Sequence, residues 1–174
     1  DASSSMNGEK WSSTMTNVVA LCKAVDMIQN LSIQVTFRTT TNNNPYIVQA
    51  YNSKVDKFSK IKQMFPYLTA NGTTPEGLCY EAIMKNFLGS TNDMDSYFLN
   101  ISDGEPYFGN SDLYYSGDIA FDHTRKMVKE IEGMGIKTLS YFVDTWTRDG
   151  DEPSYGFKRM YGNGAKLIDI TNVS

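Results

Sequence analysis

Residues 96–106 read S-Y-F-L-N-I-S-D-G-E-P, and this stretch decides the fold. Its first seven residues are mostly apolar and predict a buried strand that runs directly into Asp103-Gly104. Open α/β sheets place their ligand sites at the carboxyl ends of such strands, where a glycine permits a tight turn. Asp103 is therefore a candidate site residue, and a solvated turn carboxylate is the alternative.

Helical and strand patterns alternate on both sides of this stretch. Apolar residues spaced by three and four predict helices, and strict alternation or short apolar runs predict strands. We therefore expect an α/β fold with a mostly parallel central sheet, helices on both faces and an antiparallel hairpin over residues 32–51. The predicted helices are 10–29, 54–64, 75–88, 118–132 and 155–161, and the predicted strands are 32–40, 46–51, 96–102, 136–143 and 165–170.

The same spacing predicts which side chains face the core. Leu21 and Ile28 fall on the apolar side of the first helix, and Val55 falls on that of the second. Cys22 and Cys79 lie on apolar helix faces, so we expect two reduced core thiols. Reduced thiols indicate a reducing compartment and predict a cytoplasmic protein.

Composition narrows the classes of function. The chain has 174 residues, which suits one domain, and carries 16 Lys and Arg against 20 Asp and Glu. It has no basic run, so we expect no nucleic-acid partner. It has no apolar run near the ~18 residues of a membrane span, so we expect no membrane partner. The only histidine, His123, is expected to face solvent from a polar helix side.

The first five residues, D-A-S-S-S, place Asp1, Ser3 and Ser5 at alternate positions ahead of the first predicted helix. In an extended segment, alternate side chains point the same way. A set of carboxylate and hydroxyl oxygens suits a hard cation such as Mg²⁺ and fits Zn²⁺ or copper poorly. A disordered serine-rich tail is the alternative for this stretch alone.

Residues 71–77, N-G-T-T-P-E-G, form the second informative stretch. Pro75 at a first helical position, preceded by Thr74 as N-cap, predicts the start of a helix. Thr74 would then present its hydroxyl at the helix start, either as a site residue or only as a cap.

The three motifs, D-x-S-x-S, T-P-E-G and I-S-D-G, occur here in the order that they have in the von Willebrand factor A (vWA) domain. The chain resembles that family over essentially its whole length, and the motifs resemble its metal-ion-dependent adhesion site. The sequences I-S-D-G-E-P and N-G-T-T-P-E-G look closest to those of the A domain of cobaltochelatase-type subunits and their phage relatives.

The resemblance implies a Mg²⁺ site, with Mn²⁺ or Ca²⁺ as alternatives. The two serines of the first motif are implied as direct ligands, and the two aspartates as ligands that bind directly or through water. The threonine of the second motif binds directly or through water, and Thr73 is its fallback because the tandem threonines leave one residue open. The implied metal-ligand set is Asp1, Ser3, Ser5, Thr74 and Asp103.

The resemblance also implies a partner. In the family, an Asp or Glu from a partner protein commonly fills the open metal position, which suits an incompletely caged Mg²⁺. For a cobaltochelatase-like complex, the expected partner is a ring-forming AAA+ ATPase subunit. The domain itself is then a binding module without chemistry of its own.

The family's sheet order, 3-2-1-4-5-6, leads to a further expectation. The central strand should run into Asp1, and this sequence does not contain it. We therefore expect the chain to be a fragment, residues 1–174 forming a single vWA domain that lacks its first central strand upstream of Asp1. Another segment or chain filling that gap is the alternative.

Two other classes of function share some of these features. A Mg²⁺-dependent phosphoryl-transfer enzyme would use Asp1 as nucleophile, but such enzymes need a second carboxylate two residues on, where this chain has Ser3. The chain also has no Gly-rich phosphate-binding loop. An extracellular adhesion domain would have the same metal site, but the two cysteines lie in helices and no signal sequence is visible.

Overall fold

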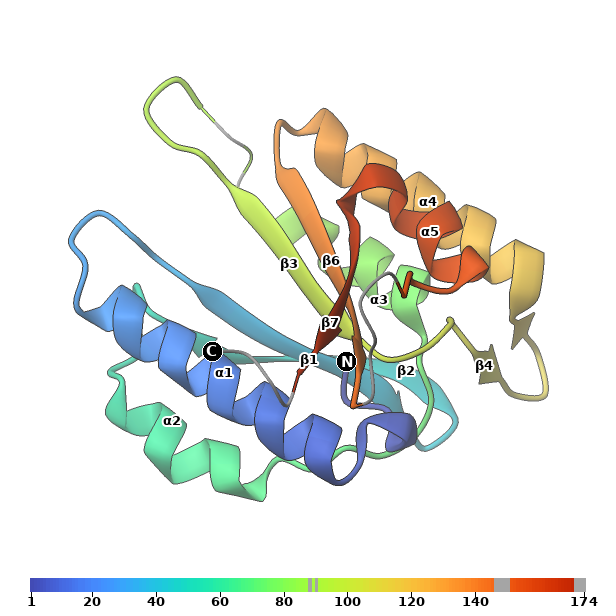
Figure 1. Ribbon diagram of the computed structural model, residues 1–174, viewed down its shortest axis with the longest axis horizontal. Helices are drawn as coiled ribbons and strands as arrows, with labels where there is room; N and C mark the ends of the chain where they lie inside the picture. The colour runs from blue at the N-terminus through green and yellow to red at the C-terminus, as the bar shows by residue number, and fades with distance from the viewer. Residues whose placement is uncertain (88, 90, 146–150, 171–174) are drawn as a thin grey trace.

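Helices and strands alternate along most of the chain (Figure 1). The structure is a computed structural model that describes residues 1–87, 89, 91–145 and 151–170. The α-helices are α1 (Glu9–Asp26), α2 (Ser59–Met64), α3 (Glu76–Ile83), α4 (Gly117–Gly133) and α5 (Tyr155–Tyr161). The strands are β1 (Gln34–Thr41), β2 (Asn44–Asn52), β3 (Tyr97–Ser102), β4 (Phe108–Gly109), β5 (Tyr114–Tyr115), β6 (Lys137–Asp144) and β7 (Ala165–Asp169).

The strands form one parallel sheet and two antiparallel pairs. β3, β6 and β7 make a three-stranded parallel sheet in that order, and β1 and β2 make an antiparallel hairpin. β4 and β5 form the second, short antiparallel pair. The predicted α/β class, with a parallel sheet and a hairpin, is confirmed. The third helix was predicted to run to about residue 88, which lies outside the described residues, but α3 ends at Ile83 and is followed by a 3-10 helix, Met84–Asn86.

Residues Asp1 and Ala2 lie between the hairpin and the parallel sheet. The Asp1 nitrogen donates to the Ile101 carbonyl of β3 at 2.9 Å, and the Ala2 nitrogen donates to the Arg38 carbonyl of β1 at 2.8 Å. Among the described residues, β1 and β3 share no ladder, so the hairpin and the parallel sheet are separate sheets.

The helices divide into two groups that cover different parts of these sheets. α1 and α2 pack against the hairpin around Phe37 and Ile61 (Figure 1). α3, α4 and α5 pack against β3 and β6 through a second cluster that includes Phe157. Trp11 of α1 contacts both the hairpin core and the cluster around Val143 of β6, so α1 links the two sheets.

Three side chains that the sequence placed in the core are exposed instead. Leu21 is 42% exposed on the outer side of α1, and Ile28 is 53% exposed because α1 ends at Asp26. Val55 is 78% exposed because it lies in the turn before α2, which begins only at Ser59. The predictions for Ile28 and Val55 were wrong because they extended helical periodicity beyond the ends of the helices. The prediction for Leu21 was wrong because the buried face of α1 is narrower than the apolar spacing suggested.

Both cysteines are buried free thiols, as the sequence predicted. Cys22 lies in the core between α1 and the hairpin, and Cys79 lies on α3. Burial raises the pKa of each thiol to about 11, so both are protonated at neutral pH.

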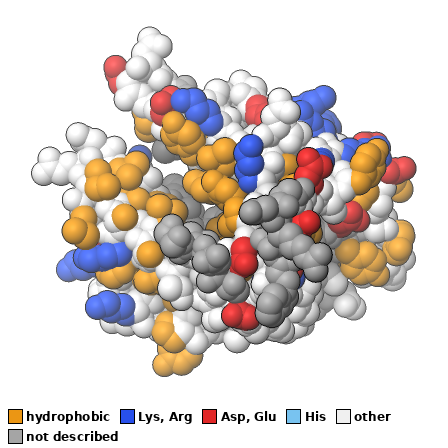
Figure 2. Space-filling model, viewed as in Figure 1, with side chains coloured by type: hydrophobic (Ala, Val, Ile, Leu, Met, Phe, Trp, Pro, Cys, Tyr) orange, Lys and Arg blue, Asp and Glu red, His pale blue; other side chains and the backbone are white. Residues whose placement is uncertain are grey.

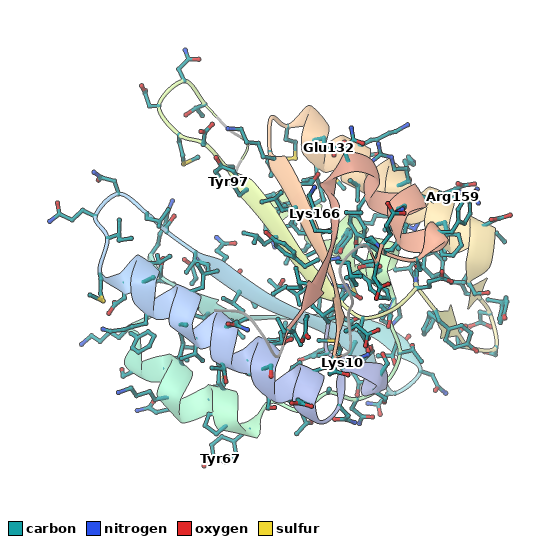
Figure 3. The ribbon with its side chains drawn as sticks, viewed as in Figure 1. Lys10, Tyr67, Tyr97, Glu132, Arg159 and Lys166 are labelled. Carbon is teal, nitrogen blue, oxygen red and sulfur yellow. The ribbon has the colours of Figure 1, made fainter. Side chains whose placement is uncertain are left out.

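The face shown in Figure 2 carries exposed hydrophobic side chains over β3, beside a hollow between α1 and β3. Tyr97, labelled in Figure 3, and Leu99 are each about half exposed on this strand. No helix within the described residues is long and apolar enough to cross a membrane.

The contrast between Ile61 and Val55 gives a test of the core. Ile61 is 1% exposed, so Ile61→Ala leaves a cavity and should lower the free energy of unfolding by about 2–5 kcal/mol. Val55→Ala removes exposed methyl groups and should change it by about 0.5 kcal/mol or less. Urea denaturation followed by circular dichroism measures both values. Equal losses in the two variants would contradict the burial pattern.

Candidate metal centre

Three loops meet at the carboxyl end of β3. The first is the segment from Asp1 to Ser5, which begins between β1 and β3 and passes into the short 3-10 helix Ser4–Met6. Met6 is fully buried and anchors this segment. Gly8, with φ of 81°, then turns the chain into α1 and serves as its N-cap, so the serines do not cap α1. Their hydroxyls are therefore available for other contacts.

Four of the five motif residues, Asp1, Ser3, Ser5 and Asp103, are joined by hydrogen bonds. The Ser3 backbone nitrogen donates to Asp1 Oδ1 at 2.9 Å, which turns the segment back on itself. Ser3 Oγ lies 3.0 Å from Ser5 Oγ, and Ser5 Oγ donates to Asp103 Oδ1 at 2.7 Å. Asp103 is 98 residues further along the chain than Ser5, so the fold brings together residues that the sequence linked only by motif.

Burial of these groups is uneven. The side chains of Asp1 and Asp103 are 0% and 1% exposed, and Ser3 is 2% exposed. Ser5 is exposed to solvent. The oxygens therefore form a cluster that is enclosed by protein on most sides and reaches solvent at Ser5.

The second loop, residues 71–74, is held against the first by backbone hydrogen bonds. The Asn71 nitrogen donates to the Ala2 carbonyl at 2.7 Å, and the Ser4 nitrogen donates to the Gly72 carbonyl at 3.0 Å. Gly72 has φ of 77°, and a Cβ there would lie 2.6 Å from the Thr40 carbonyl oxygen. Only glycine fits this close approach, which sets the path of the loop.

The two neighbouring threonines have different environments. Thr73 Oγ1 donates to Thr40 Oγ1 of β1 at 3.2 Å, so its hydroxyl is engaged away from the serines. Thr74 is 5% exposed, and its carbonyl accepts from the nitrogens of Tyr107 and Glu76. The interpretation of Thr74 as a helix cap was wrong, because α3 begins at Glu76 and its N-cap residue is Pro75, with no capping side chain. The hydrogen bonds of the described residues do not join the Thr74 hydroxyl to Ser3, Ser5 or Asp103, whereas the Thr73 hydroxyl is bonded to β1.

A buried ion pair lies directly behind Asp1. Arg38 of β1 donates to Glu76 Oε1 at 2.5 Å, and the same Arg38 nitrogen lies 3.9 Å from Asp1 Oδ2. Glu76 is 0% exposed, and its Oε1 also accepts from Asn100 at 3.1 Å and from Tyr161 at 2.7 Å. This network joins β1, α3, β3 and α5 through one carboxylate oxygen.

The tyrosines of the network act as donors. Burial raises the pKa of Tyr80 and Tyr161 well above 10, so both phenols stay protonated. Tyr161 lies 2.6 Å from Tyr80 and donates its proton to Glu76. Burial alone would lower the pKa of Arg38, but the nearby oxygens of Tyr80 and Glu76 raise it overall. Among the described residues, Glu76 Oε2 and Arg38 Nε have no hydrogen-bond partner.

Sequence reasoning missed four contributors to this region. Ser102 donates to Asp1 Oδ2 at 2.5 Å, and Lys10 donates to Asp103 Oδ2 at 2.8 Å. Ser102 was detectable as the hydroxyl of I-S-D-G. Lys10, Arg38 and Glu76 carry no local signal, since a charged side chain in a strand or a first helical turn is usually solvated.

His123 is less exposed than the sequence predicted, with 24% of its side chain accessible. Its Nδ1 lies 3.0 Å from the Tyr115 hydroxyl, and its Nε2 lies 3.6 Å from Glu81. It packs at the α3–α4 contact, where a Cβ on Gly77 would lie 3.0 Å from its Nδ1.

The donor chemistry of the cluster suits a small divalent cation, because it consists of carboxylate and hydroxyl oxygens. The contacts from Ser3 to Ser5 and from Ser5 to Asp103, at 3.0 Å and 2.7 Å, are hydrogen bonds of ordinary length that hold these oxygens next to one another. The described residues contain no group of three or more His, Cys, Asp or Glu side chains suited to a metal, so a site here depends on hydroxyls.

Comparison of the chain with protein-family models gives no match. Comparison with curated proteins gives no match either. The function of the oxygen cluster therefore has to be inferred from its geometry and donor chemistry.

The Arg38–Glu76 pair should be essential for stability. Arg38→Met leaves Glu76 buried without a cation and should lower the free energy of unfolding by about 3–5 kcal/mol. Adding Glu76→Gln should restore part of that loss, because the stranded charge is removed. Lys126→Met, which breaks an exposed pair with Glu130, serves as control and should change stability by about 1 kcal/mol or less. Urea denaturation measures these variants together with Glu76→Gln alone, and a loss in the double variant equal to the sum of the two single losses would contradict the coupling.

Proposed function

We propose that this chain is a vWA-type binding module that holds Mg²⁺ and, through it, a carboxylate of a partner protein. The observation that carries the proposal is the contact chain from Ser3 through Ser5 to Asp103, which brings two of the three motifs together. The loop that precedes the T-P-E-G motif is joined to it by the backbone bond from Ser4 to Gly72. Mn²⁺ or Ca²⁺ are alternatives to Mg²⁺ with the same preference for oxygen.

Each residue has a role in this proposal. Ser3 and Ser5 bind the ion directly through hydroxyl lone pairs, which remain available when the hydroxyl protons are donated to neighbours. Thr74 binds directly or through water. Asp1 and Asp103 hold coordinated waters or bind directly, and their buried positions keep both carboxylates beside the hydroxyls. When bound, the ion supplies a Lewis-acidic position for an oxygen ligand from outside.

The arrangement of the strands supports the family proposal. β2 pairs with β1, and β3, β6 and β7 form a parallel sheet, with Asp1 and Ala2 bonded to both β1 and β3. With a strand running into Asp1, these pairings correspond to the family's 3-2-1-4-5-6 order. A ligand site at the carboxyl ends of neighbouring strands is the usual position in open α/β sheets.

The solvent-facing side of the oxygen cluster supports a role in binding. Ser5 is exposed while the other ligand side chains are enclosed, so an outside ligand has one direction of approach. Mg²⁺ gives up water reluctantly and tends to keep open positions for ligands from a partner. An Asp or Glu on a partner protein has the charge and the oxygen chemistry to fill such a position.

The finer proposal is a subunit of a cobaltochelatase-like complex whose partner is a AAA+ ATPase. It rests on the resemblance of the sequences I-S-D-G-E-P and N-G-T-T-P-E-G to that family. The two buried free thiols are compatible with a reducing cytoplasm. The residue two positions after Asp1 favours binding over phosphoryl transfer, because Ser3 stands where such an enzyme needs a second carboxylate.

Metal binding tests the proposal directly. Calorimetric titration with Mg²⁺ should show one site, and Asp103→Asn should weaken it at least about tenfold, because a charged oxygen is replaced by a neutral amide. At Mg²⁺ concentrations about 100 times Kd, the free energy of unfolding should rise by about 2.7 kcal/mol. Partner capture should then require Mg²⁺ and be lost with EDTA. Absence of Mg²⁺, Mn²⁺ and Ca²⁺ binding to the folded chain would refute the proposal.

The tandem threonines provide a matched pair of variants. Thr74→Val keeps the shape of the side chain but removes the hydroxyl, and should weaken Mg²⁺ binding by about 3-fold to 30-fold, depending on whether the contact is direct. Thr73→Val should leave binding unchanged within about twofold, because that hydroxyl is bonded to Thr40. The same titration measures both variants, and the reverse ranking would assign the role to Thr73.

A further inference from the structure

Lys10, in the first turn of α1, reaches across to the loop after β3 (Figure 3). Its Nζ lies 2.8 Å from Asp103 Oδ2, while the other oxygen of the same carboxylate accepts from Ser5. The Lys10 side chain is 23% exposed and that of Asp103 is 1% exposed. The ammonium group is therefore held between the enclosed cluster and solvent. It contacts Asp103 Oδ2, the oxygen that does not accept from Ser5.

The charges around the cluster are unequal in number. The Asp1 amino group, which donates to the Ile101 carbonyl, also lies at the cluster and is counted separately from the side chains. Three side-chain carboxylates, Asp1, Asp103 and Glu76, face two side-chain cations, Arg38 and Lys10, so the formal charge of this set of side chains is minus one. A bound Mg²⁺ changes it to plus one. Without Lys10, the same metal-loaded set would be neutral. Because the set is largely enclosed by protein, these charges are screened less than charges on an open surface.

We propose that Lys10 is the residue that keeps the metal-loaded centre cationic, so that it selects an acidic ligand. This inference rests on the function proposed above and adds a division of roles. The hydroxyls and Asp103 favour the cation, whereas Lys10 opposes cation binding by charge repulsion and favours the carboxylate that follows. The charge of Lys10 therefore weakens the binding of the metal ion and strengthens the binding of a carboxylate to the metal-loaded centre.

Because Lys10 contacts Asp103, it could also act by orienting that carboxylate, and the test must distinguish this role from the effect of its charge. If Lys10 only orients Asp103, its loss would weaken metal binding and carboxylate binding together. If it sets the charge, its loss has opposite effects on the two, since repulsion of the metal and attraction of the carboxylate arise from the same positive charge. The directions of the two changes therefore distinguish the roles.

The test uses Mn²⁺ as the metal and acetate as the carboxylate. Water-proton relaxation of the Mn²⁺-loaded chain reports metal binding, and its fall on titration with sodium acetate, compared with sodium chloride at equal ionic strength, reports carboxylate binding. Lys10→Met should bind Mn²⁺ about tenfold more tightly and acetate about tenfold more weakly than the unaltered chain. Circular dichroism checks that the variant is folded.

Two control variants accompany this measurement. Lys10→Arg keeps the charge and should leave both affinities within about threefold. Lys23→Met, on the same helix but paired with Asp26, removes a charge away from the cluster and should leave both unchanged. If the unaltered chain binds no Mn²⁺, the proposed function fails and this inference with it. If it binds Mn²⁺ but Lys10→Met shifts both affinities in the same direction, or neither, the metal centre stands and the role of Lys10 is overturned.

Discussion

The buried contact between Arg38 and Glu76 is the interaction on which the arrangement of the chain depends. Glu76 opens α3 and is completely enclosed, so its charge has to be met inside the protein. Arg38 meets it from β1, Asn100 from β3 and Tyr161 from α5. These elements come from distant parts of the sequence, and a shift of any one would leave a buried polar group unpaired. The network therefore restricts how the hairpin and the parallel sheet can lie against each other.

The Arg38–Glu76 network also helps to position the oxygen cluster. Arg38 also lies near Asp1, whose nitrogen is bonded to β3, so the first loop is positioned by the same two strands that the ion pair holds together. Gly72 brings the second loop close to β1 because no side chain separates their backbones. The ligands proposed for the metal are thus supported by backbone bonds and by a buried charge pair. Such support is needed because the position of a short hydroxyl side chain is set almost entirely by its backbone.

Predictions from local patterns succeeded where one physical signal dominated. Alternation in residues 32–40 and the apolar run before Asp103 identified β1 and β3 to within two residues. They failed where tertiary packing decides the outcome. Val55 continues the apolar spacing of α2 but precedes its first turn, and Leu21 lies just outside the part of α1 that meets the hairpin. Thr74 looked like a cap, yet α3 starts two residues later. Helix ends and the width of a buried face depend on neighbours that periodicity does not contain.

The sequence by itself determined the α/β class, the two buried thiols, the hairpin and the candidate residues of the three motifs, because each is expressed over a few consecutive positions. Only the tertiary structure decided that Ser5 meets Asp103, that Thr73 bonds to Thr40, and that Arg38, Glu76 and Lys10 surround the cluster. The physical reason is that charge pairing and oxygen contacts act through space over a few ångströms. Residues nearly a hundred positions apart acquire such contacts only when the packing of strands and helices brings them together.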